Sequence, residues 1–71
     1  MRQWLDDFAA VLGTATPTDA EVEALLALAG VAAHASERTA APVSCWLAAK
    51  AGTSPAEAAE AARRLADPSD G

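Results

Sequence analysis

Residues whose side chains could do chemistry gather between positions 34 and 45. His34 and Cys45 are the only histidine and the only cysteine of the chain, and Arg38 and Ser44 lie between them. Where a helix that ends in basic residues meets the start of another helix, the cations and the free N–H groups can together bind a phosphate or a carboxylate. His34, Arg38 and Ser44 therefore form a candidate anion site.

A structural interpretation competes with this site. If the preceding helix extends to Arg38, His34 and Arg38 share one flank of it, where they can cap the last carbonyl groups and offset the negative end of the helix dipole. We favour this architectural role. For Cys45 we favour a small buried apolar role over a reactive thiol, and the sequence leaves its reactivity open.

No residue set typical of an enzyme or a metal centre is evident. A zinc site built on His34 and Cys45 would lack two ligands. Asp6 and Asp7 are adjacent, so on a helix their carboxylates point about 100° apart, which suits a solvated face better than a shared acid–base step. The sequence therefore predicts no enzyme, no catalytic residue, no bound metal and no cofactor.

Composition restricts the partners. The 71 residues carry a net charge of −5, with dispersed basic residues, which argues against nucleic-acid binding. No apolar run approaches the roughly 20 residues of a membrane span, and acids near the N-terminus disfavour a signal peptide. We expect a cytoplasmic protein without membrane association. One cysteine allows no intramolecular disulfide, so self-association is expected to supplement a small core.

Helices must position these residues. Alanine occupies 21 of the 71 positions, while β-branched and aromatic residues are sparse, and this composition favours helices over strands. We predict an all-α fold: a compact bundle of four short helices with the second and third at its centre. The helices are expected at about residues 2–12, 18–37, 42–51 and 55–66, in one domain of residues 1–66 with a flexible tail at 67–71.

Local signals set the helix ends. Pro42 suits the first position of the third helix. In the last helix, Glu60 and Arg64 have the spacing of an i, i+4 ion pair. Two capping boxes predict the starts of the second and fourth helices: Thr18 with Glu21, and Ser54 with Glu57. Gly13 and Gly52 predict the ends of the first and third helices.

The apolar pattern predicts the core. The first helix has one apolar stripe, and the third is apolar nearly all round, so we expect the third to be largely buried, with the Lys50 stem along apolar surface. Three aromatic residues are expected as core fillers: Trp4, Phe8 and Trp46.

The second helix is apolar on two opposite sides, as in a helix that is central or shares one face with a partner. Leu28, Val31 and Ala35 lie on one of these stripes and are expected to form an interaction surface. Gly30 interrupts the helix at a cost of about 1 kcal/mol relative to alanine, which is typical of a close helix crossing or a bend, and we favour the close crossing.

The pattern resembles an actinobacterial small helical domain of unknown function, found alone or joined to the C-terminus of molybdenum cofactor guanylyltransferases. The matching elements are an N-terminal tryptophan, a histidine at a helix end, an Arg-x-Ala-Ala-Pro segment and an apolar helix: Trp4, His34, Arg38, Ala40, Ala41, Pro42 and residues 43–52. Thr39 stands where that pattern usually has proline, so the connection is less stiff, and the hydroxyl could cap the next helix or bond a local group.

Two functional hypotheses follow. The resemblance implies an accessory domain in molybdenum cofactor maturation or molybdoenzyme assembly. Its expected partners are a second copy, a guanylyltransferase or a maturation protein, bound through spare apolar faces. The alternative is a small-ligand domain that holds a phosphate, nucleotide or cofactor at the junction of His34, Arg38 and Ser44.

Overall fold

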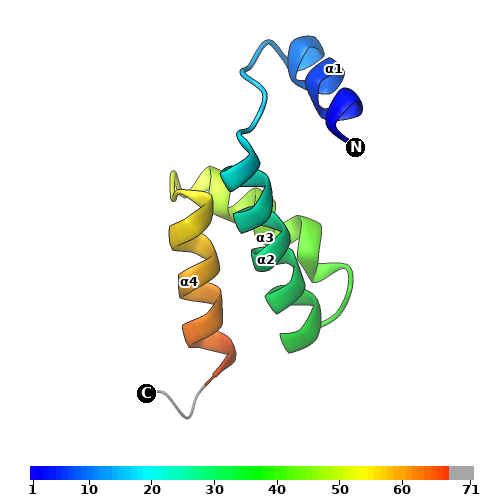
Figure 1. The fold of residues 1–71 in the computed structure, drawn as a ribbon. Helices are drawn as coiled ribbons and strands as arrows, with labels where there is room; N and C mark the ends of the chain where they lie inside the picture. Colours follow the sequence, from blue (N-terminus) through cyan, green and yellow to red (C-terminus); the bar gives the residue numbers. More distant parts are fainter. Residues whose placement is uncertain (68–71) are drawn as a thin grey trace.

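The computed structural model describes residues 1–67, which form four helices and no strand (Figure 1). The helices are α1 (Arg2–Leu12), α2 (Asp19–Ala35), α3 (Ala40–Lys50) and α4 (Pro55–Ala66). The predicted all-α fold with four helices is confirmed. Of the predicted tail at 67–71, Asp67 follows α4 and residues 68–71 lie outside the described residues.

The ends of α1 and α4 agree with the prediction, but the connection between α2 and α3 is shifted. α2 ends at Ala35 rather than near residue 37, and α3 begins at Ala40 rather than at Pro42. Thr39 already has helical backbone angles, and the N–H of Ala40 donates to the carbonyl of Glu37, so a turn leads directly into α3. The early start therefore comes from backbone hydrogen bonding before the proline.

Both predicted capping boxes are present. The N–H of Glu21 donates to Thr18 Oγ1 at 3.1 Å, and Glu21 Oε1 accepts from the N–H of Thr18 at 2.8 Å. Ser54 and Glu57 make the same reciprocal pair at 3.2 and 3.3 Å. Gly13 ends α1 in the left-handed conformation with φ 75°, which glycine adopts without a steric cost. The starts of α2 and α4 are thus defined by local chemistry.

Packing links only three of the helices. α2 packs on both α3 and α4, and α3 packs on α4, whereas α1 packs on none of them. Figure 1 shows α1 projecting beyond the N-terminal end of α2. The molecule measures 42 × 21 × 19 Å, and its radius of gyration is 12.9 Å; about 11 Å is typical of a 71-residue domain. The projection of α1 accounts for the long axis.

The core among α2, α3 and α4 is built from small side chains. Leu28 is 4% exposed and packs with Ala58 and Ala59 of α4. Partly buried side chains complete this cluster: Ala27, Cys45, Ala48 and Ala62. α2 is central, as predicted, because it supplies the one large side chain of the cluster.

The expectation that α3 is largely buried is wrong. No residue of α3 is buried, because only the side that carries Cys45 and Ala48 packs on the core. The opposite side carries Val43, Trp46 and Leu47, and each of these is more than half exposed. An apolar pattern all round the helix therefore does not bring cover on both sides within this chain.

Two further packing expectations are also wrong. A Cβ built on Gly30 meets nothing within 4 Å, so this glycine does not mark a close helix crossing. The aromatic residues do not fill the core: Trp4 is 63% exposed, Trp46 is 60% exposed, and Phe8 is exposed too. Trp4 and Phe8 remain outside because α1 does not fold back onto the other helices.

Polar contacts hold the connection between α1 and α2 along one side of α1. The Arg2 guanidinium donates to the Pro17 carbonyl and lies 3.8 Å from Asp19. The Thr16 hydroxyl donates to Asp6 Oδ1 at 2.7 Å. Since this segment occupies the polar side of α1, the apolar side of the helix is directed away from it.

Candidate functional site

The residues of the predicted anion site are not brought together in one hollow. His34 lies in the last turn of α2 and lines a groove between α2 and α4. Ser44 lines a second hollow, among α2, α3 and α4. Arg38 lies in the exposed connection before α3 and lines neither of these hollows. Thr39 bonds locally, as one expectation had it: its hydroxyl donates to Glu37 Oε1 at 2.7 Å and does not cap α3.

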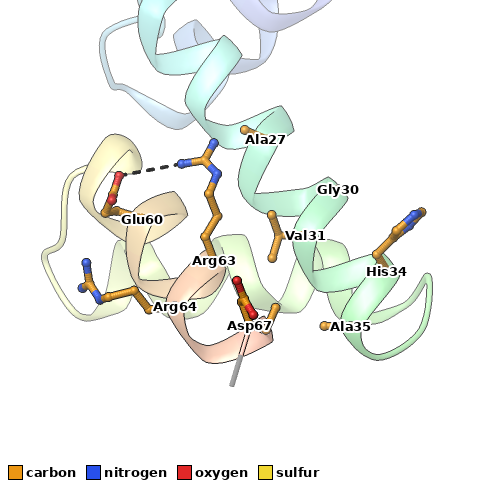
Figure 2. Close-up of a pocket in the computed structure, with 10 residues that line it drawn as sticks. Ala27, Gly30, Val31, His34, Ala35, Glu60, Arg63, Arg64 and Asp67 are labelled. Atoms are coloured by element: carbon orange, nitrogen blue, oxygen red, sulfur yellow. Dashed lines mark ion pairs between the residues drawn. The ribbon is translucent and has the colours of Figure 1, made fainter. Parts of the chain in front are cut away.

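The groove between α2 and α4 has a volume of about 930 Å³ and an apolar floor that includes Ala27 and Val31. Charged residues line its α4 side. Arg63 Nη1 lies 3.8 Å from Glu60 Oε2, an i, i+3 pair that replaces the expected pair of Glu60 with Arg64. Figure 2 shows Arg63 reaching between the two helices, while His34 and Arg64 point in opposite directions. The cations around the groove therefore do not converge on one point.

Sequence reasoning missed Arg63 and Arg64 as neighbours of His34. α2 and α4 run in the same direction, with α3 between them in the chain, so their C-terminal ends lie at the same end of the molecule (Figure 1). Both last turns carry basic residues. The signal available in the sequence was the presence of basic residues near the C-terminal ends of both helices. Such residues can stabilise the negative ends of the two helix dipoles, and they can also bind an anionic ligand.

Cys45 is half-buried and belongs to the packing around Leu28. Its thiol donates to the carbonyl oxygen of Leu25 in α2 at 3.9 Å. These contacts favour the structural role over a reactive one. Within residues 1–67, no group of three His, Cys, Asp or Glu residues is placed to hold a metal ion.

The predicted interaction stripe on α2 divides into a core residue and two surface residues. Leu28 is buried against Ala58 and Ala59, so its assignment to an interaction surface is wrong. Val31 and Ala35 line both hollows beside α2. On the second side of α2, α4 therefore covers Leu28, whereas Val31 and Ala35 stay at the surface.

Two other surfaces carry most of the large exposed apolar side chains; Met1, Leu26 and Leu65 lie outside them. The α1 face consists of Trp4, Phe8, Val11 and Leu12, and the α3 face consists of Val43, Trp46 and Leu47. A monomeric protein seldom leaves contiguous apolar patches of this kind in water, and such patches mark protein or ligand contacts.

Each face contains an ordered aromatic contact. On the α1 face, the rings of Trp4 and Phe8 stack with their centroids 4.9 Å apart. On the α3 face, the Lys50 ammonium lies 5.2 Å from the centroid of the Trp46 ring. The Lys50 stem had been expected along apolar surface; its ammonium in fact covers an aromatic ring in a cation–π contact.

No helix in the described part of the chain is long and apolar enough to cross a bilayer.

Comparison with other proteins identifies the family. Neither the curated proteins nor the solved structures contain a match. One family model matches residues 1–70, nearly the whole chain. The chain therefore belongs to the family described as Domain of unknown function (DUF6457).

Proposed function

We propose that this chain is a non-enzymatic interaction domain that binds a protein surface through the α1 face and the α3 face. The observation that carries the proposal is the exposure of two apolar helix faces that nothing else in residues 1–67 covers. Aromatic residues and arginines dominate the energetics of protein interfaces, and each face presents a tryptophan. Burial of these rings would release water from apolar surface.

The proposed process is molybdenum cofactor maturation or molybdoenzyme assembly in the cytoplasm. The resemblance of the elements around Trp4, His34 and Pro42 to a domain joined to molybdenum cofactor guanylyltransferases supports this assignment. Such a domain would contribute binding and no reaction of its own. Its expected partners are a second copy of the chain, a guanylyltransferase or a molybdoenzyme maturation protein.

Sedimentation of the purified chain, alone and mixed with a molybdenum cofactor guanylyltransferase, tests the proposal. We expect a complex in at least one of the two samples. Val11→Glu and Leu47→Glu should weaken it by about tenfold or more, because a carboxylate would be placed in an apolar contact. Leu65→Glu is the matched control, since Leu65 is 86% exposed on α4 and outside both faces. A chain that stays monomeric in both samples contradicts the proposal.

Ligand binding in the groove between α2 and α4 is the second candidate function. Arg63 reaches between the helices above the apolar floor (Figure 2), so an anion with an apolar part could bind there if it displaced Glu60. Groove volumes near this value are common among small-molecule sites.

Calorimetric titration with phosphate and with GTP separates the groove from the junction predicted by sequence. If the groove binds the anion, Arg63→Gln should abolish the heat and Arg38→Gln should leave it unchanged. The reverse result would assign binding to the junction of His34, Arg38 and Ser44. No heat with the unaltered chain would eliminate both sites for these ligands.

A further inference from the structure

We propose that the partner of the two apolar faces is a second copy of this chain, and that two copies exchange their N-terminal helices: α1 of each packs on α3 of the other. This inference rests on the proposed interaction function and specifies its partner and geometry. It concerns the α1 face and the α3 face as defined above.

The first argument is the area that must be covered. The seven side chains of the two faces are Trp4, Phe8, Val11, Leu12, Val43, Trp46 and Leu47, and all are exposed. At about 150–250 Å² for an aromatic side chain and less for valine or leucine, their exposed parts amount to on the order of 800 Å² per chain. That area matches the roughly 800 Å² that each partner buries in a stable interface of standard size. A symmetric exchange would cover both faces of both chains at once.

The second argument is that α1 is positioned away from its own α3. The connection at residues 13–18 follows the polar side of α1, where Arg2 contacts Pro17 and Thr16 contacts Asp6. α1 consequently packs on none of the other helices of the same chain, and the ion pair of Arg2 with Asp19 is an exposed polar link to the first residue of α2. A projecting helix with an outward apolar face is the arrangement that allows exchange between copies.

The third argument is charge. α3 carries one charged side chain, Lys50, which lies over Trp46 within the α3 face. α1 carries Asp6 and Asp7 against a single cation, Arg2. Asp7 flanks the apolar side of α1, one turn before Val11 and next to Phe8 in sequence. Pairing α1 with α3 therefore brings opposite charges together, whereas pairing α3 with α3 would bring two Lys50 ammonium groups together and pairing α1 with α1 would bring acidic helices together.

Sedimentation velocity of the full-length chain, followed across the micromolar range, tests the exchange. We expect a monomer–dimer equilibrium. Val11→Glu on α1 and Leu47→Glu on α3 should each raise the dissociation constant by about tenfold or more, and Leu65→Glu should leave it unchanged. All three positions are exposed in the monomer, so the helical circular dichroism of each variant should match that of the unaltered chain.

The pattern of the two variants distinguishes the possible occupants. Loss of the dimer with Val11→Glu alone would indicate contact between two α1 helices and overturn the exchange. Loss with Leu47→Glu alone would indicate contact between two α3 helices and would overturn it equally. A monomer at all concentrations would mean that α1 closes onto its own chain or that the faces bind another protein.

Mixing provides a positive signature. A dimer formed between one Val11→Glu chain and one Leu47→Glu chain retains one unaltered α1–α3 contact, because both changes fall in the other contact. The mixture should therefore dimerise more tightly than either variant alone. A mixture no tighter than its components would contradict the exchange. Failure of this test with a guanylyltransferase complex still formed would leave the proposed interaction function standing; failure of both would remove it.

Discussion

Different interactions stabilise the two ends of this molecule. Around Leu28, the helices α2, α3 and α4 exclude water through close contact of small side chains. In the N-terminal part, exposed polar contacts such as that of Thr16 with Asp6 place α1, and the four side chains of the α1 face remain in water. Exposed polar contacts contribute little free energy, so the first region supplies nearly all the stability of the single chain and the second supplies surface.

The largest expected difference between the regions concerns Leu28. Leu28→Ala should lower the free energy of unfolding by about 2–5 kcal/mol, since it removes the one large buried side chain of the core. A chain of this length has only about 4–10 kcal/mol in total, so part of the population should be unfolded.

Denaturant titration followed by circular dichroism measures this loss. Val11→Ala in α1 is the matched truncation, because Val11 is 81% exposed, and below the dimerisation range it should change the free energy by less than about 0.5 kcal/mol. Equal losses in the two variants would show that α1 packs on the rest of the same chain.

The cap of α4 gives the next effect. Ser54→Ala removes the acceptor for the N–H of Glu57 and should cost about 1 kcal/mol in the same titration. Ser54→Thr keeps the hydroxyl and should retain most of that stability. If the alanine variant were as stable as the unaltered chain, the start of α4 would be held by packing and not by its cap.

Gly30 offers a change in the opposite direction. Gly30→Ala should raise the free energy of unfolding by about 0.5–1 kcal/mol, because a Cβ there meets open space and alanine favours the helix. The midpoint of thermal unfolding, followed by circular dichroism, should rise. A fall would restore the close crossing that the sequence predicted.

The smallest energetic effect belongs to the N-terminal connection. Thr16→Val removes the hydroxyl that binds Asp6 and should change the free energy of unfolding by less than about 0.5 kcal/mol. The backbone order parameters of residues 14–17, from nuclear magnetic resonance relaxation, should nevertheless fall. Thr14→Val is the control, since in the described residues no hydrogen bond of the Thr14 hydroxyl is found. Unchanged order in the Thr16 variant would mean that other contacts position α1.

The sequence correctly predicted the helix ends that depend on residues close to one another in the chain. Thr18 with Glu21, Ser54 with Glu57 and the left-handed Gly13 act within a few residues, so the start of α2 and of α4 and the end of α1 follow directly from residue type. Two local signals misled: Glu60 pairs with Arg63 instead of Arg64, and Pro42 does not begin α3, because proline tolerates the first turn of a helix without having to begin it.

Predictions that depend on distant neighbours were less successful. An apolar stripe predicts that a helix face is buried, but it does not identify the element or partner that buries it. For this reason the sequence predicts Trp46 in the core of the single chain. The candidate site failed to assemble for a similar reason. His34 lines a groove with Arg63 because α2 and α4 run the same way, and nothing in the spacing of His34, Arg38 and Ser44 contains that direction.

The small side chains of the core also have a calorimetric consequence. The buried residues in the described part of the chain are Ala9, Leu28, Ala58 and Ala59. Heat capacity rises on unfolding in proportion to newly hydrated apolar area, and the denaturant dependence scales with total exposed area. Unfolding of a single chain should therefore give a heat-capacity increment below the usual value of about 12–15 cal/mol/K per residue. The free energy of unfolding should accordingly depend only weakly on temperature. Association that covers the tryptophans would raise the heat-capacity increment and strengthen the temperature dependence of the free energy of unfolding. The curvature of that free energy with temperature therefore reports whether chains unfold singly or as an assembly.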